Sequence, residues 1–249
     1  MVKHRPMGFK FALLTILCAV ATPAFAAEPT IEELLNATDD VNRGESSQST
    51  IEMQVKTKRY ERSMTMKAWS RGEEDSLIRI LSPAKDAGTT TLKVGDDMWN
   101  YIPKIDRTMK IPPGMMSGSW MGSHFSNDDL VKSNRLADEF DYKKESFVDG
   151  VYTIVCTAKA DAAVVWGKVI VKVRADKIPV EVAYYDEDGE LARKMTFSDV
   201  KDFDGRKVPA TMLLVPADRP DEFTRITTTE LDFDVQFDAR TFSLQALKE

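Results

Sequence analysis

The chain has 249 residues and carries 34 Lys and Arg against 40 Asp and Glu, for a net charge of −6. An acidic chain has no electrostatic attraction for nucleic acid or for an anionic membrane surface, which argues against both as partners. A chain of this length buries enough surface to be stable without disulfides.

The first 26 residues have the organisation of a cleavable signal peptide. A basic start is followed by the apolar run 11–20, which is too short for a transmembrane helix of roughly 20 residues. Ala24 and Ala26 supply the small residues that a signal peptidase reads. We therefore expect cleavage after Ala26, export out of the cytoplasm, and a single mature domain over residues 27–249.

Cleavage leaves 31 Lys and Arg against 40 Asp and Glu, a net charge of −9. Cys18 lies in the leader, and Leu17 before it is larger than the residue that lipid attachment requires, so we expect a soluble exported protein. Cys156 alone remains in the mature chain, which excludes an intramolecular disulfide. In the apolar run 151–156 this thiol is best interpreted as a buried strand residue.

The first element of the mature chain is predicted to be an amphipathic helix. Thr30 and Glu33 form a capping box at its start, and Gly44 marks its end. Five positions recur on one face at helical spacing, namely Ile31, Leu34, Leu35, Thr38 and Val41. A helix with one apolar stripe needs a sheet to pack against.

Strands are predicted over most of the remaining chain. Residues 51–56 alternate strictly between apolar and polar, and similar runs follow at 63–70, 76–82, 89–94, 97–102, 151–156, 168–173 and 231–237. Asp-Gly turns occur at 149–150, 188–189 and 204–205. We expect a mainly β fold, a half-open curved antiparallel barrel of about 10 or 11 strands, with helices or a lid on the concave face, and a closed, wholly packed barrel is the alternative.

The stretch from Met98 to Leu130 is too broken by Pro and Gly to form one regular element, yet it contains two Trp and five Met. Such side chains re-pack around varied partners, so the stretch is either the lid of an apolar cavity or an irregular plug at the end of the sheet. One good helix is too little to fill a large concave face, which favours the lid.

No pattern of catalytic chemistry stands out. His124 is the single His of the mature chain and has no nucleophile-elbow motif near it. Asp128 and Asp129 follow Ser126 as the acidic first turn of a helix would. With one His and one Cys a metal site of these ligands is excluded, and no phosphate-binding or dinucleotide-binding glycine pattern occurs. We therefore expect neither an enzyme nor a bound cofactor or metal.

Two motifs resemble the signature of the outer-membrane lipoprotein-sorting protein family. Residues 99–103 read Trp-Asn-Tyr-Ile-Pro, where the family has W-x-Y-x-P, and residues 120–130 read WMGSHFSNDDL, where the family has F-M-G-S-D-F-S-x-E-D-L. The departures are Trp120, His124 and Asp128. The resemblance implies a LolA/LolB-like fold, a half-open β-barrel that carries acyl chains of lipids or lipoproteins in the periplasm. Many relatives of this branch accompany RND/MMPL-type exporters, which implies an inner-membrane transporter as a partner.

We accordingly expect a monomeric carrier of lipid or lipoprotein acyl chains, with a sensor or regulatory module using the same cavity as the alternative and a hydrolase less favoured. The residues expected to form the acyl cavity and its lid are Trp99, Tyr101, Met115, Met116, Trp120, Met121, Phe125 and Leu130. Three glycines, Gly114, Gly118 and Gly122, are expected to act as the lid hinge. Trp99 and Tyr101 are predicted as the wall beneath the lid, although an ordinary core position suits their alternation equally well.

Overall fold

A computed structural model describes residue 1 and residues 28–131, 136–162 and 164–249 of the chain. The expected signal peptide and its cleavage site lie outside the described residues. Within the described part, thirteen strands form one antiparallel sheet, two or three strands more than predicted. The mainly β, curved and open architecture with few helices is confirmed.

The strands run in the order β6-β5-β4-β3-β2-β1-β13-β12-β11-β10-β9-β8-β7 across the sheet. Their bounds are β1 Ser46–Lys56, β2 Glu61–Arg71, β3 Asp75–Ser82, β4 Thr90–Val94, β5 Asp97–Ile102, β6 Arg107–Lys110, β7 Phe140–Val148, β8 Val151–Ala158, β9 Lys168–Arg174, β10 Pro179–Tyr185, β11 Leu191–Phe203, β12 Arg206–Pro216 and β13 Phe223–Phe233. The helices are α1 Ile31–Asp39, α2 Asn127–Val131 and α3 Leu136–Glu139, with 3-10 turns at Pro103–Ile105, Pro113–Met115, Trp120–Gly122 and Ala246–Lys248.

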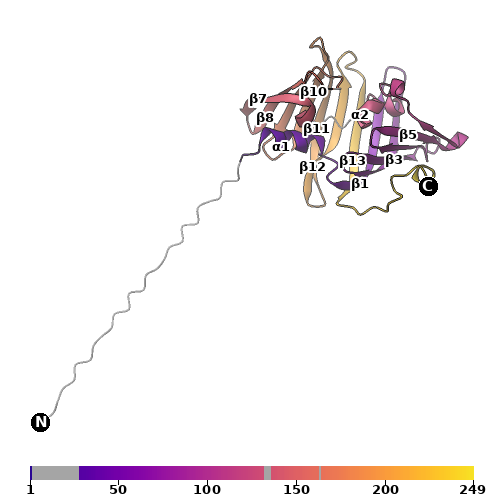
Figure 1. The fold of residues 1–249 in the computed structure, drawn as a ribbon, viewed down its shortest axis with the longest axis horizontal. Helices are drawn as coiled ribbons and strands as arrows, with labels where there is room; N and C mark the ends of the chain where they lie inside the picture. Colours follow the sequence, from indigo (N-terminus) through magenta and orange to yellow (C-terminus); the bar gives the residue numbers. More distant parts are fainter. Residues whose placement is uncertain (2–27, 132–135, 163) are drawn as a thin grey trace.

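The sheet joins the two ends of the chain at its centre, because β1 pairs with β13. Figure 1 shows β7 and β8 at one end of the curved sheet and β3 and β5 at the other, with β1 and β13 between them. Strand β6, which pairs with β5, lies beyond the predicted strand 97–102, where no strand was predicted. Its residues carry no apolar alternation, so only pairing with β5 reveals it.

The α1 helix begins where the capping box predicts, since the Thr30 side chain accepts a hydrogen bond from the Glu33 N–H at 3.1 Å. It ends at Asp39, five residues before Gly44, and turns lead from there into β1. Helices α1 and α3 contact each other, and they also contact β7 at the end of the sheet.

Two apolar clusters pack on the concave face and leave a space between them. The first joins α1 and α3 to β7–β10, around Leu34, Leu35, Phe140 and Val171. The second, which contains Trp120, joins the stretch after β6 to β1, β2, β3 and β5. Covering elements therefore pack tightly at both ends of the sheet, and the centre of the concave face is less filled.

The last residues of the chain cover the opposite face of the sheet. The strand predicted over 231–237 stops at Phe233, because Asp234 adopts a left-handed conformation with φ of 56°. The chain then leaves the sheet, and Phe237 and Phe242 pack against Leu77 of β3 in a third apolar cluster.

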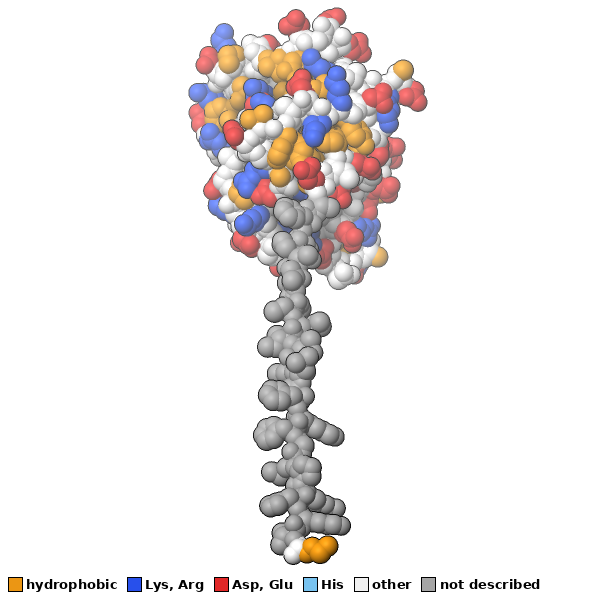
Figure 2. Space-filling view, turned by 90° about the vertical axis from the view of Figure 1, so that its left-hand side faces the viewer, with side chains coloured by type: hydrophobic (Ala, Val, Ile, Leu, Met, Phe, Trp, Pro, Cys, Tyr) orange, Lys and Arg blue, Asp and Glu red, His pale blue; other side chains and the backbone are white. Residues whose placement is uncertain are grey.

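The free edge at β7 mixes apolar and charged side chains. Tyr142, Phe147 and Val148 are exposed on this strand, and Lys143 and Lys144 stand among them. Figure 2 views the molecule from that side and shows apolar groups interspersed with charged ones. Charges on an edge strand oppose edge-to-edge pairing with another sheet.

Candidate functional site

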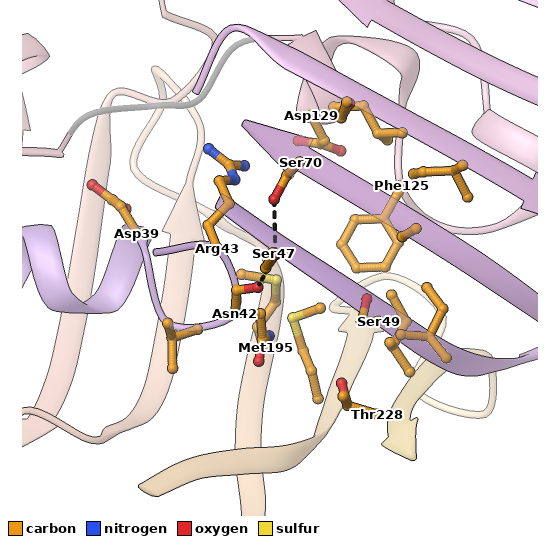
Figure 3. Close-up of a pocket in the computed structure, with 18 of the residues that line it drawn as sticks. Asp39, Asn42, Arg43, Ser47, Ser49, Ser70, Phe125, Asp129, Met195 and Thr228 are labelled. Carbon is orange, nitrogen blue, oxygen red and sulfur yellow. Dashed lines mark hydrogen bonds between the residues drawn. The ribbon is translucent and has the colours of Figure 1, made fainter. Parts of the chain in front are cut away.

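A cavity of about 360 Å³ lies on the concave face between the two apolar clusters. Its floor comes from the central strands of the sheet, and it is covered by residues of the α1–β1 connection together with Trp120, Phe125, Asp129, Leu130 and Leu136. Pockets for small ligands have volumes of roughly 300–1,000 Å³. Figure 3 shows its lining, with Phe125 on one side and the α1–β1 connection on the other.

The floor contains a row of apolar side chains that crosses five strands. Strand register places Phe197, Met212, Ile226, Met53 and Met64 opposite one another on β11, β12, β13, β1 and β2. Met53 and Met64 are fully buried in the cluster that contains Trp120. The other three are only half-buried and face the cavity. Apolar surface is thus available to a ligand at the middle of the row.

The floor becomes polar toward the α1–β1 connection. On β1 the concave side reads Val55, Met53, Ile51, Ser49 and Ser47 in order. The Ser47 hydroxyl lies 2.9 Å from the Ser70 hydroxyl and donates to the Asn42 carbonyl at 3.3 Å (Figure 3). The cavity therefore has an apolar middle and a hydroxyl-lined end.

Trp120 anchors the cover to the sheet. Its side chain is 3% exposed, and its indole N–H donates to the Thr91 hydroxyl at 3.1 Å. Thr91 in turn donates to the Asn100 side-chain oxygen at 2.7 Å. The backbone N–H of Trp120 donates to the Phe125 carbonyl at 2.8 Å, which closes the loop. This end of the cover is firmly attached.

His124 fastens the same loop to β13. Its Nδ1 lies 2.8 Å from the Thr224 hydroxyl and its Nε2 lies 3.1 Å from Glu222, while only 5% of the side chain is exposed. The Glu222 carboxylate also accepts from the Lys58 backbone N–H at 2.8 Å. These bonds give His124 an anchoring role in the structure, a role that sequence patterns left open.

Asp129 and Arg193 form a buried ion pair at the cavity wall. The two carboxylate oxygens accept from the guanidinium at 2.6 and 2.8 Å. The guanidinium carbon of Arg193 also lies 4.6 Å from the ring centre of Trp166 and 4.6 Å from that of Tyr184. Burial alone raises the pKa of Asp129, but the hydrogen bonds and charge of Arg193 outweigh it and hold that pKa below its usual value.

Asp129 also has the helix-capping role that its position predicts, because its carboxylate accepts from the Ser126 N–H at 2.8 Å. Sequence reasoning missed Arg193, which is 64 residues away and is brought to this wall by β11. No local pattern marks such a pair, since it depends on strand register.

Asp39 at the end of α1 connects two covering elements. Its carboxylate accepts from the Leu136 N–H at 3.0 Å, at the start of α3. Burial raises the pKa of Asp39 to about 7, because ionisation away from water is unfavourable, and the nearby charge of Asp40 adds to the effect. The hydrogen bond from Leu136 acts in the opposite sense.

Three of the predicted ligand-binding residues, Trp120, Phe125 and Leu130, line the cavity. Met116 and Met121 pack against the Trp120 cluster and are not among the residues that line the cavity. Met115 is 58% exposed at the surface. The structure thus brings four of the six predicted lid residues, Met116, Trp120, Met121 and Leu130, to one cluster, and Trp120, Leu130 and Phe125 reach the cavity.

Trp99 and Tyr101 do not line the wall beneath Trp120, so this prediction is wrong. Both alternate on β5 with Met98, which packs in the Trp120 cluster, and their side chains therefore project from the opposite face. There they pack in the cluster that contains Phe242 and Leu247 of the C-terminal segment. The alternation of residues showed that Trp99 and Tyr101 share one side of β5. It did not show on which face of the sheet the cavity lies.

The three predicted hinge glycines differ in their surroundings. A Cβ on Gly122 would lie 2.8 Å from the Tyr60 hydroxyl oxygen, and the residue has a positive φ of 69°. A Cβ on Gly118 would lie 3.0 Å from the Met115 carbonyl oxygen. Gly114 has open space around it. Close packing explains two of these glycines, and the hinge role stays a prediction that Gly114 suits best.

The described residues contain no cluster of three or more His, Cys, Asp or Glu side chains arranged to hold a metal ion. None of the helices in the described part of the chain has the length and apolar character needed to cross a bilayer.

An open, curved antiparallel sheet with a covered cavity on its concave face defines a LolA-like fold. A putative outer-membrane lipoprotein-sorting protein domain from Vibrio parahaemolyticus shares it with a TM-score of 0.72 and 23% identity, over 86% of this chain and 97% of that one. A LolA superfamily protein from Nitrosomonas europaea shares it with a TM-score of 0.70 and 18% identity, over 89% and 100% of the two chains. The predicted LolA/LolB-like fold is confirmed.

Residues 72–249 match the model of a family described as an uncharacterized protein, and the chain belongs to that family. A DUF1329 family protein from Desulfovibrio piger is similar in structure, with a TM-score of 0.76 and 27% identity over 87% of this chain and 97% of that one. No curated protein sequence matches the chain significantly.

Proposed function

We propose that this protein is a periplasmic carrier that holds the acyl chain of a lipid or lipoprotein in the concave cavity and passes it toward the outer membrane. The observation that carries the proposal is the half-buried apolar row of Phe197, Met212 and Ile226 inside a covered cavity. The LolA-like fold and the similarity to a lipoprotein-sorting domain support it. A sensor that reports occupancy of the same cavity is the second candidate on the same grounds.

The energetics of such a carrier depend on apolar burial. Each methylene of the acyl chain that is removed from water contributes about 0.8 kcal/mol to binding. The cavity must therefore shield the acyl chain from water and still allow the cargo to dissociate. Met195 and Met212 in the cavity lining suit this task, because Met side chains adapt to ligands of different shape. Transfer of this kind makes and breaks no covalent bond.

A catalytic role finds no support in the thiol of the mature chain. Cys156 packs inside the cluster formed by β8 and its neighbours, and burial raises the pKa of its thiol to about 12. A thiol with that pKa has almost no thiolate at neutral pH and is a poor nucleophile.

The proposal includes a monomer that receives cargo from an inner-membrane transporter. Charged residues on the free β7 edge, which disfavour pairing between copies, support the monomeric state. The proposal of a transporter partner rests on the family resemblance alone. Crosslinking in cells from a benzoyl-phenylalanine placed at exposed Phe147 or Met115 would identify such a partner.

The decisive test combines lipid extraction with dye binding. The protein purified from periplasm is extracted for mass spectrometry, and binding of an uncharged solvatochromic dye is measured after delipidation. Met212→Trp, which fills the cavity, should abolish both signals. Leu213→Trp, on the next residue and the opposite face of β12, is the matched control and should retain them. Absence of lipid and of dye binding in the unsubstituted protein would contradict the proposal.

A further inference from the structure

The polar end of the cavity is built from serine side chains in cross-strand register. Ser47 on β1 lies opposite Ser70 on β2, which lies opposite Ser76 on β3. The next row toward the cavity middle is Ser49, Ala68 and Ile78. All six residues line the cavity. The floor thus changes from hydroxyl groups to apolar side chains within a few strand residues.

Several polar groups at this end have unused hydrogen-bonding capacity. The side-chain oxygen of Asn42 is buried and has no hydrogen-bond partner among the described residues. The hydroxyls of Ser49 and Ser76 likewise form no hydrogen bond within the described part of the chain. A buried acceptor without a hydrogen-bond partner destabilises the protein, and a ligand that donates a hydrogen bond to it removes this penalty. A hydrocarbon chain offers no such donor.

The charges around the serine row do not favour an anion. Asp39 and Arg43 both line this end of the cavity, so one carboxyl group accompanies one guanidinium, and Asp129 and Arg193 of the wall neutralise each other. Burial is the main cause that raises the pKa of Asp39, and the charges of Asp40 and Glu73, which do not line the cavity, add to it, while Arg43 acts in the opposite sense. The lining therefore offers a carboxylate or phosphate no excess of positive charge, whereas an uncharged hydroxyl group needs none.

We propose that the cargo is a lipid with an uncharged, hydroxyl-bearing head, held inside the cavity with the head on the serine row and the hydrocarbon against Phe197, Met212 and Ile226. This inference rests on the proposed function and specifies its substrate class. The head donates a hydrogen bond to the Asn42 side-chain oxygen and exchanges hydrogen bonds with Ser49 and Ser76. A cavity of about 360 Å³ suits one slender hydrophobic body more than the several chains of a lipoprotein anchor.

Three probes with the same acyl chain test the inference on the delipidated protein. They are a monoacylglycerol, the free fatty acid and the fatty acid methyl ester, each measured at pH 8 by displacement of the uncharged dye. The monoacylglycerol should bind at least about fivefold more tightly than either other probe, since a single neutral hydrogen bond contributes about a fivefold factor.

The double variant Ser49→Ala/Ser76→Ala should remove most of this preference and leave methyl ester binding unchanged. Ser63→Ala is the matched control, because Ser63 is exposed on the other face of β2 and should leave all three affinities unaltered. Thermal unfolding of each variant reports whether the fold is retained, and Ser49→Thr, which keeps the hydroxyl, should keep the preference.

The possible outcomes separate the two proposals. If the dye and all three probes fail to bind, the carrier function itself is contradicted. If the probes bind with equal affinity, if the fatty acid binds most tightly, or if the double variant keeps the preference, the inference about the head is overturned while the carrier function stands.

Discussion

Asp129 holds Arg193 through both carboxylate oxygens, at 2.6 and 2.8 Å, and so ties the helix that follows the Trp120 loop to strand β11. The Arg193 side chain is 11% exposed and the Asp129 side chain is 13% exposed, and the pair forms part of the cavity wall. A charge pair in this place links the cover of the cavity directly to its floor.

Removing one partner of this pair should be strongly destabilising. Asp129→Asn leaves the buried guanidinium without a counter-charge, a loss that typically costs about 3–5 kcal/mol. Urea unfolding followed by circular dichroism measures the change. Asp176→Asn provides the control, because the Arg174–Asp176 pair is nearly half exposed and should contribute below about 1 kcal/mol. Equal effects of the two substitutions would contradict a structural role for the buried pair.

The indole of Trp120 should contribute through both its ring and its N–H group. Trp120→Phe keeps an aromatic ring but loses the hydrogen bond to Thr91, which should cost about 1 kcal/mol of unfolding free energy. Trp120→Ala also leaves a cavity and should cost about 3–5 kcal/mol. Dye affinity should fall in the alanine variant because the cover is lost. Unchanged dye binding by a folded Trp120→Ala protein would contradict the assignment of Trp120 to the lid.

Asp39 should make stability depend on pH in the direction opposite to that of an ordinary paired carboxylate. Its pKa is about 7 in the folded protein, above the ordinary aspartate value of 3.8, so the folded state binds a proton that the unfolded state releases. The stabilisation of the folded state by this bound proton is complete below about pH 4. It is lost as pH rises toward 7, by about 1.4 kcal/mol of unfolding free energy per pH unit.

Asp39→Asn removes this ionisation while its side-chain oxygen can still accept from Leu136. The difference in unfolding free energy between the two proteins should therefore grow in favour of the variant from pH 4 to 7 and then level off. Denaturant unfolding at several pH values measures it, with exposed Asp141→Asn as the control. A constant difference across this range would show that Asp39 ionises normally.

Gly122 and Gly114 should respond differently to alanine. Gly122→Ala places a side chain in a left-handed conformation against Tyr60, which should cost at least about 1–2 kcal/mol. Gly114→Ala meets open space, so any loss of stability should be small. If Gly114 is the hinge of the lid, Gly114→Ala should slow dye release in stopped-flow measurements although stability hardly changes. Identical release rates before and after Gly114→Ala would contradict the hinge.

Local patterns were sufficient to predict much of the architecture. The capping box located the start of α1, alternation and Asp-Gly turns predicted the antiparallel sheet, and the motif around Trp120 indicated both the fold and the cover. These signals succeed because each depends on residues close in sequence. The same locality explains why β6, with no apolar alternation, was missed.

Features that depend on long-range register could not be predicted. Alternation made Trp99 and Tyr101 look like cavity residues, and only the C-terminal segment packed on the other face explains them. The Asp129–Arg193 pair and the serine row likewise arise when distant strands meet. Single serines in separate strands carry no sign that they will become neighbours.

The two edge strands, β6 and β7, have a consequence for the width of the cavity on the concave face. Within the described part of the chain they stand at opposite ends of the strand order, so the curved sheet is not closed into a ring. A closed ring has a circumference set by its strand number and stagger. An unclosed sheet can instead bend about its central strands, and the distance between its two halves then varies while every ladder hydrogen bond is kept. In a sheet of this kind, the width of the concave cavity depends on the bending stiffness of the sheet and not on its strand count alone.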